Sequence, residues 1–246
     1  MSGHSKWANI KRRKGKQDAA RGKIFTKIIR EITVAARMGG GDIAGNPRLR
    51  LVVDKALSQN MTKDTIDRAI KRGAGGEEGS NMETIWYEGY GPLGIAILVE
   101  CLTDNRNRTV SEVRHALSKR GGNLGTSGSV SYLFKDQGII TVNQKVPEEY
   151  LMEIALNAGA EDVNYDEENG SEIICAPENF WLVKEVLDRE NIVCEGEILK
   201  IASVRNALDK ENSLKIMDLI DDLENLDDVQ NVYTNGDFSE EVLSEE

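Results

Sequence analysis

Apolar residues in the first third of the chain recur with the period of an α-helix. At 100° per residue, those of segment 21–38 fall on one arc, while Lys23, Lys27, Arg30 and Arg37 fall on the opposite arc. The apolar arc comprises Ile24, Phe25, Ile28, Ile29, Ile32, Ala35 and Ala36. One side of this predicted helix therefore packs, and the other side is cationic.

Local signals set the ends of this helix and predict two more. Three glycines at 39–41 should end the first helix, because glycine favours positive φ and is costly inside a helix. Asn46-Pro47 reads as the N-cap and first residue of a second helix. Thr62 reads as the N-cap of a third, which should stop at Gly73. Together they predict a small helical bundle.

The pattern changes after the polar, glycine-rich stretch 73–81, which we interpret as a domain boundary. The next predicted elements are a buried strand at 94–102, a helix at 106–119 and a strand at 129–134. From Gly138 a second cycle follows: strand 139–142, helix 147–158, strand 162–166, a hairpin turn at 169–170, strand 172–175, helix 178–191 and strand 192–201. This second order, β-α-β-β-α-β, is typical of a ferredoxin-like unit.

A helix at 209–225 and a strand at 229–234 supply the elements that segment 83–135 lacks, so the ferredoxin-like unit is predicted to be an insertion. We predict an α+β protein in which an N-terminal helical bundle precedes two ferredoxin-like α+β domains, the third inserted into the second. The predicted boundaries are 1–75 for the basic bundle, 82–136 plus 205–238 for the second domain, 137–204 for the inserted domain and 239–246 for an acidic tail.

Charge divides the chain at the same boundary. Residues 1–72 carry 18 Lys and Arg against 6 Asp and Glu, whereas the whole chain of 246 residues has a net charge of −11. Such segregation is typical of a module that sits on a polyanion and is joined to modules that avoid one. Nucleic acid is the leading candidate partner, and the acidic domains could contact a protein.

The densest basic cluster is segment 6–30, with ten Lys and Arg and a single acid, Asp18. Such cations bind phosphate backbones through counterion release; the alternatives are a solvated basic helix or a localisation signal. Trp7 could stack on a base, although packing on the bundle is favoured. The predicted nucleic-acid-binding residues here are Lys6, Trp7, Lys11, Arg12, Arg13, Lys14, Lys16, Arg21, Lys23, Lys27, Arg30 and Arg37.

Two later segments are weaker candidates for phosphate binding. Arg106 and Arg108 open a helix, where two guanidinium groups and free backbone N–H groups could hold a phosphate; capping by Asp104 is the alternative. The glycine-rich segment 121–129 precedes a strand and lacks a Gly-Lys-Ser/Thr sequence leading into a helix. A flexible connection is therefore the better interpretation of that segment.

Catalytic and metal-binding patterns are missing from the sequence. Neither His4 nor His115 has a nucleophile or paired carboxylate placed beside it, and the three cysteines are isolated. We therefore expect no enzymatic activity, no cofactor and no metal. Isolated cysteines in apolar surroundings favour a reducing cytoplasm. No apolar run approaches the roughly 20 residues of a membrane span, so we expect no membrane partner.

Several motifs closely resemble the YebC/PmpR family over essentially the whole chain. They are segments 1–14, 22–32, 46–50, 71–73, 88–92 and 102–109. The resemblance implies three domains with an N-terminal helical bundle, a cytoplasmic location and a DNA-binding transcriptional regulator. Mitochondrial members of the family activate translation, and some bacterial members are linked to ribosome function, so DNA and RNA both remain open as targets.

Three functional hypotheses follow. The first is a non-enzymatic transcriptional regulator whose basic bundle binds duplex DNA. The second is a translation factor that uses the same bundle on the ribosome, on ribosomal RNA or on transfer RNA. The third is a protein-interaction scaffold whose basic face meets an acidic protein.

Overall fold

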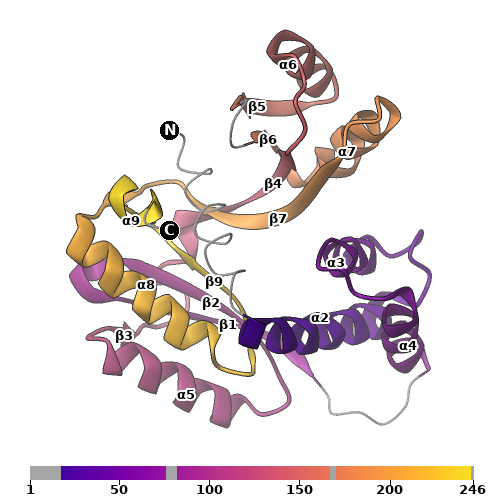
Figure 1. Cartoon of the computed structure of the whole chain (residues 1–246). Helices are drawn as coiled ribbons and strands as arrows, with labels where there is room; N and C mark the ends of the chain where they lie inside the picture. Colours follow the sequence, from indigo (N-terminus) through magenta and orange to yellow (C-terminus); the bar gives the residue numbers. More distant parts are fainter. Residues whose placement is uncertain (1–17, 76–81, 167–169, 245–246) are drawn as a thin grey trace. The chain divides into compact units, whose positions relative to one another are not determined.

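The structure is a computed structural model that describes residues 18–75, 82–166 and 170–244 (Figure 1). Phe134–Ser203 forms one compact unit, and the described residues before and after that segment belong to a second unit. The second unit begins with helices and continues into a sheet, and the first unit holds another sheet. The predicted α+β class, with a helical bundle ahead of two α+β sheets, is confirmed.

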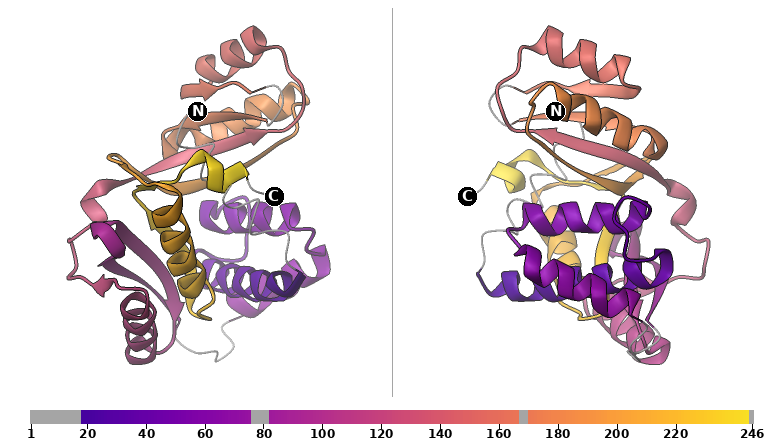
Figure 2. Two further views of the ribbon diagram at one scale, coloured as in Figure 1. Left: turned by 60° about the vertical axis from the view of Figure 1, so that its left-hand side comes forward. Right: turned by 90° about the vertical axis from the view of Figure 1, so that its right-hand side faces the viewer.

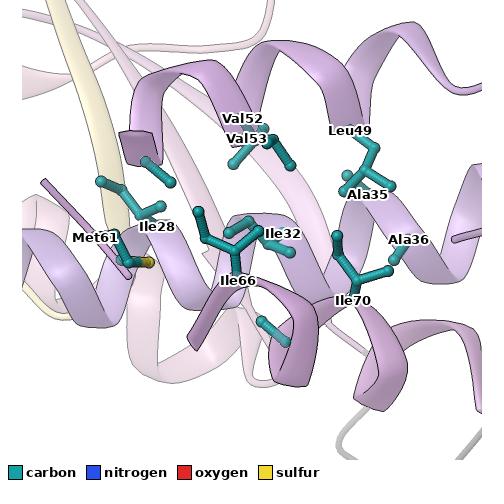
Figure 3. Close-up of a cluster of buried hydrophobic side chains, with 12 residues drawn as sticks. Ile28, Ile32, Ala35, Ala36, Leu49, Val52, Val53, Met61, Ile66 and Ile70 are labelled. Atoms are coloured by element: carbon teal, nitrogen blue, oxygen red, sulfur yellow. The ribbon is translucent and has the colours of Figure 1, made fainter. Parts of the chain in front are cut away.

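The N-terminal helices form a bundle with its own core. The helices are α2 (Asp18–Gly39), α3 (Pro47–Ser58) and α4 (Lys63–Ala74). Ile28 and Ile32, on the predicted apolar arc of α2, are at most 1% exposed and point into the space between α3 and α4 (Figure 3). The other buried core members are Ala35, Ala36, Leu49, Val52, Val53, Ala56, Met61, Ile66, Ala69 and Ile70.

One asparagine fixes the turn between α2 and α3. The Asn46 side-chain oxygen accepts the backbone N–H of Leu49 at 3.1 Å, which caps α3. Its amide nitrogen donates to the carbonyls of Ala35 at 2.9 Å and Gly40 at 2.8 Å, which satisfies backbone acceptors near the end of α2. Gly40 has φ +85°, and α2 ends at Gly39 as predicted. The predicted caps Asn46 and Thr62 are both confirmed.

Gly73 does not stop α4, contrary to prediction, because the helix continues to Ala74. A Cβ placed on Gly73 would lie 2.2 Å from the carbonyl oxygen of Thr33 and 2.9 Å from the Cβ of Ala36. The glycine is therefore required by the close approach of α4 to α2, a contact between helices that sequence periodicity does not reveal.

The rest of this unit is a four-stranded antiparallel sheet in the order β3-β1-β2-β9. Its elements are β1 (Glu83–Tyr90), the 3-10 turn η1 (Pro92–Gly94), β2 (Ala96–Thr103), α5 (Arg106–Lys119), β3 (Asn123–Leu124), α8 (Lys210–Glu224) and β9 (Val229–Thr234). Gly89 approaches the side chain of Leu117 on α5, and Gly91 approaches Leu219 on α8. Both helices therefore cover the same face of the sheet (Figure 1).

Two sequence predictions for this sheet were wrong. The prediction omitted β1, because charges at Glu83 and Glu88 interrupt the apolar pattern of this strand. β1 precedes the predicted β-α-β order and is a central strand of the sheet. Segment 129–134 was predicted to be a strand but contains the 3-10 turn η2 (Ser131–Leu133). Its amides at Val130 and Ser131 donate to the Glu88 carboxylate rather than to a neighbouring strand.

Short elements complete the unit. β8 (Asn206–Ala207) pairs in parallel with β10 (Gly236–Asp237). The predicted acidic tail includes a helix, α9 (Glu240–Ser244), whose Val242 is fully buried. The start of that segment is therefore packed, which its acidic composition did not predict.

The unit Phe134–Ser203 contains an antiparallel sheet in the ferredoxin-like order β5-β6-β4-β7. Its elements are β4 (Phe134–Val142), α6 (Glu148–Asn157), β5 (Ala160–Asn164), β6 (Ser171–Cys175), the 3-10 turn η3 (Pro177–Asn179), α7 (Phe180–Arg189) and β7 (Cys194–Ala202). A Cβ on Gly138 or Gly196 would lie 2.8 Å from ring atoms of Phe180. These two glycines leave room for the Phe180 ring of α7, and α6 lies on the same side of the sheet (Figure 2).

Gly73→Ala should destabilise the bundle by about 1 to 3 kcal/mol, the usual range for overpacking, because its new methyl would overlap the Thr33 carbonyl. Gly22→Ala is the matched control, since nothing lies within 4 Å of the corresponding Cβ position. It should be neutral or stabilising by up to about 1 kcal/mol, because alanine favours the helix. Urea unfolding followed by circular dichroism measures both. Equal effects at the two positions would contradict the role given to Gly73.

Candidate nucleic-acid interface

The structure places the predicted basic residues in different surroundings. Lys6, Trp7, Lys11, Arg12, Arg13, Lys14 and Lys16 lie outside the described residues. Arg21 lies on α2, but its side chain is also outside the described part. Lys23, Lys27, Arg30 and Arg37 lie further along α2, as predicted.

Three cations of α2 contact the C-terminal end of α8. The Lys27 ammonium donates to the carbonyl of Glu224 at 2.7 Å. Lys23 donates to the carbonyl of Asn225, the C-cap, at 3.3 Å, and Arg30 donates to that of Asp227, in the turn after the helix, at 2.9 Å. The last carbonyls of a helix lack intrahelical partners and carry the negative end of its dipole. The cationic face of α2 therefore neutralises the end of α8 in this structure.

Burial of Lys27 in this contact has an electrostatic cost. Burial lowers the pKa of its ammonium from 10.5 to about 8, although the nearby Glu224 carboxylate opposes the shift. Lys23 and Lys55 add repulsion that lowers the pKa further. The charged form of Lys27 is thus less favourable in the folded chain than in water.

Asp228, in the turn between α8 and β9, joins three parts of this unit. Its carboxylate is bonded by Arg108 at 2.8 Å, by the Thr109 hydroxyl at 2.8 Å and by the Thr103 hydroxyl at 3.0 Å. Arg30 of α2 lies 3.7 Å from its second oxygen. Burial alone would raise the pKa of Asp228, but the bonds from Arg108 and the two hydroxyls outweigh it and lower the pKa. A charged Asp228 therefore ties the bundle to the start of α5.

Carboxylates of the chain itself occupy the predicted phosphate site at the start of α5. Arg108 is paired with Asp228 and with Asp104, the latter at 3.0 Å, and Arg106 bonds the Glu83 carboxylate with two nitrogens. The expected cap Asp104 is wrong: Asn105 caps the helix, accepting the N–H of Arg108 at 3.1 Å. Both guanidinium groups already have anionic partners.

The end of the glycine-rich segment 121–129 and the two residues after it hold an anion from the chain. The Glu88 carboxylate accepts the N–H groups of Gly128, Val130 and Ser131, each at 2.7 Å. Burial would raise the pKa of Glu88, but these three backbone donors outweigh it and lower the pKa. The expected flexible connection is a fixed loop, because the buried Glu88 needs these donors to remain charged.

Carboxylates of the acidic stretch 218–228 are paired with cations of the chain. Arg120, the C-cap of α5, bonds Asp222 and Asp218, each at 2.8 Å, and its bond to Asp222 holds the pKa of that carboxyl at about 2. Since Asp228 is also paired, this acidic stretch binds cations of the chain from two sides. Sequence spacing could not reveal these partners, because they lie about a hundred positions earlier in the chain.

A cleft of about 510 Å³ lies beside the contact between α2 and α8. It is lined by Arg30, Met82, Asp104, Arg108, Glu112, Asn225, Leu226, Asp227 and Asp228. Carboxylates outnumber the two arginines, and both arginines are already bonded to the chain. This cleft is therefore poorly suited to a phosphate.

Other cations of the bundle face solvent on α4. Lys63, Lys71 and Arg72 are exposed, and Arg68 pairs with Asp64 one turn earlier at 2.7 Å. Arg48 of α3 instead donates to the Thr84 hydroxyl at 3.3 Å. Most exposed cations of the described bundle thus lie on α4. On the predicted face of α2, Lys23 is exposed, whereas Lys27, Arg30 and Arg37 are only partly exposed.

Over the described residues, no group of three or more His, Cys, Asp and Glu side chains is placed to hold a metal ion. Within the same residues, no helix has the length and apolarity needed to cross a membrane.

Comparison with known proteins identifies the family. Residues 5–76 match the model of the TACO1/YebC protein N-terminal domain, and residues 82–236 match that of the TACO1/YebC second and third domain. The chain belongs to the TACO1/YebC family. This confirms the resemblance seen in the sequence motifs.

Relatives in the TACO1/YebC family match over nearly their full length. A probable transcriptional regulatory protein of Proteus mirabilis is 59% identical over 246 residues, covering 100% of this chain and 98% of that protein. One of Idiomarina loihiensis is 57% identical over 245 residues, covering 99% and 98%. A solved structure of a conserved hypothetical protein from Aquifex aeolicus is 47% identical, with a TM-score of 0.82, and covers 93% of this chain and 95% of that chain.

Lys27→Met should remove a pH-dependent part of the stability while keeping the aliphatic stem. Between pH 8 and 10.5 the folded chain has lost the Lys27 proton that the unfolded chain retains, so the stability of the wild type rises with pH across this window. We therefore expect the difference in the free energy of unfolding, wild type minus Lys27→Met, to rise between pH 8 and 10.5. Its slope should be at most about 1.4 kcal/mol per pH unit. Urea unfolding at several pH values measures it. A flat or falling difference would show that the Lys27 ammonium is not buried.

Proposed function

We propose that this chain is a non-enzymatic, cytoplasmic nucleic-acid-binding regulator of gene expression that holds phosphates with its basic N-terminal segment. The relatives named probable transcriptional regulatory proteins support a regulatory role. The distribution of positive charge carries the proposal. Segment 6–16 has six Lys and Arg and no acid, whereas Lys23, Lys27 and Arg30 are bonded to α8.

The proposed phosphate-binding set differs from the full predicted set. We retain the cations of segment 6–16 and add the exposed Lys63, Lys71 and Arg72 of α4. Arg106 and Arg108 are left out, because carboxylates of the chain already neutralise them. The acidic second and third domains are proposed to repel nucleic acid and to face a protein partner.

Phosphate contacts should outweigh base readout in this mode of binding. Segment 6–16 offers Lys and Arg, with Asn9 as its single asparagine and no glutamine. Bidentate contacts to adenine edges need Asn or Gln side chains, so few are available. We therefore propose duplex DNA as the target, bound with weak sequence preference. A clear preference for structured RNA would favour the translation factor instead.

Replacing Lys11, Arg12, Arg13 and Lys14 together by glutamine in the full chain should weaken binding to duplex DNA and reduce its salt dependence. Each phosphate contact contributes about −0.9 to the slope of log K against log salt, so the slope should become less steep by about 3 to 4. Fluorescence anisotropy over a salt series measures the slope.

The matched control replaces four exposed cations of the acidic domains, Lys135, Lys145, Arg189 and Lys215, by glutamine. It changes the net charge by the same amount and should leave the slope close to that of the wild type. If both variants lose the same slope, the attraction depends on overall charge and the N-terminal segment is not the binding element. Absence of salt-dependent binding by the wild type to DNA and RNA would overturn the proposed function.

A further inference from the structure

The hydrogen bonds between α2 and the end of α8 are made by polar groups, but Val34, one turn after Arg30 on the same face of α2, is also buried and is not part of the bundle core. These bonds run from Lys23, Lys27 and Arg30 to backbone carbonyls, and the side-chain amide oxygen of Asn225 lies 3.5 Å from Lys23. The bundle has its own apolar core, formed by α2, α3 and α4 (Figure 3). Leaving this contact would therefore not open the bundle core. Polar interfaces between domains commonly permit relative motion.

The end of α8 presents oxygen acceptors to the cations of α2, as a nucleic-acid backbone would. Three successive cations at one-turn spacing meet a row of oxygen acceptors with partial negative charge. Phosphate oxygens carry a full charge and form stronger bonds with Lys and Arg than neutral carbonyls do. Asp227 and Asp228 add carboxylates at the same place, and Arg30 lies beside Asp228. The helix end and a phosphate backbone can therefore compete for the same three cations.

We propose that the docking of α2 on the end of α8 is an autoinhibitory contact that withholds Lys23, Lys27 and Arg30 from nucleic acid. On binding, phosphates take the place of the α8 carbonyls, and the bundle leaves α8. This inference rests on the proposed function, since it assumes that the N-terminal bundle binds nucleic acid. It adds a second binding surface, on which Lys27 and Arg30 are partly buried in the docked state and Lys23 stays exposed. It also gives a reason for weak binding in the docked state.

Asn225 allows the contact to be altered without changing any of the three cations. It is the C-cap of α8, and it is exposed. Asn225→Lys places a new cation among the carbonyls that Lys23 and Lys27 use, so it should favour the undocked state. Asn225→Asp places a carboxylate beside Lys23 and should favour the docked state. The two variants should shift the affinity for nucleic acid in opposite directions.

Asn157 supplies a matched control for both substitutions. It is the exposed last residue of α6, so a charge there meets a helix C-terminus as a charge at Asn225 does. Asn157→Lys and Asn157→Asp change the net charge of the chain equally. Because α6 belongs to the unit Phe134–Ser203, these substitutions leave the contact with α2 untouched.

The affinity of the full chain for a 20-base-pair duplex and for an RNA hairpin tests the proposal at fixed salt. Asn225→Lys should bind more tightly than Asn157→Lys, and Asn225→Asp more weakly than Asn157→Asp, each by about fivefold. That factor corresponds to about 1 kcal/mol, the interaction of two charges some 4 Å apart in water. Equal effects at the two positions, with binding intact, would overturn the autoinhibitory contact and leave the proposed function standing.

Hydrogen exchange separates undocking from a direct contact of the new lysine with phosphate. If nucleic acid replaces α8 as the partner of α2, residues 224–229 lose their contact with α2. Their backbone amides should then exchange faster in the complex of the wild-type chain than in the free chain. Unchanged or slower exchange in that segment would overturn the proposal even if Asn225→Lys binds more tightly. Failure of the wild type and all four variants to bind either probe would instead overturn the proposed function.

Discussion

The contact of α2 with the C-terminal end of α8 organises the unit that contains the bundle. A helix end carries unpaired carbonyls, and Lys23 and Lys27 of α2 bond them here, while Arg30 bonds the Asp227 carbonyl in the turn that follows. Asp228 extends this contact to α5 through Arg108. The same electrostatic complementarity that suggests nucleic-acid binding in the sequence thus acts within the chain. The electrostatic cost of this contact falls on Lys27, because burial lowers the pKa of its ammonium to about 8.

Anion-binding patterns in this sequence are filled by carboxylates of the chain itself. Glu88 occupies the glycine-rich loop, Asp228 meets Arg108 near the start of α5, and Glu83 pairs with Arg106. A loop of backbone N–H groups or a pair of arginines specifies negative charge but does not specify its source. These pairs give α5 and its neighbouring loop a structural role. They also concentrate the proposed phosphate binding in the N-terminal segment and α4.

Features that depend on neighbouring residues could be predicted from the sequence. The caps Asn46 and Thr62, the end of α2 at Gly39 and the apolar arc of α2 all follow from local spacing. Features that depend on distant partners could not be predicted from the sequence. Glycine is required at position 73 because the backbone of another helix lies close to it. The acceptors of the α2 cations lie about 200 positions away. For the candidate site, local spacing placed Lys23, Lys27 and Arg30 on one face of α2 but could not reveal the carbonyls that they bond.

The central claim is that α2 is docked on α8 in the free chain. Amine acetylation at pH 8, followed by mass spectrometry of individual lysines, tests this most directly. A lowered pKa would by itself make the Lys27 amine more reactive than an ordinary lysine, so only burial in the contact can slow it. If α2 is docked on α8, Lys27 should react more slowly than the exposed Lys63 of the same bundle. Reaction of Lys27 as fast as that of Lys63, or faster, would contradict it.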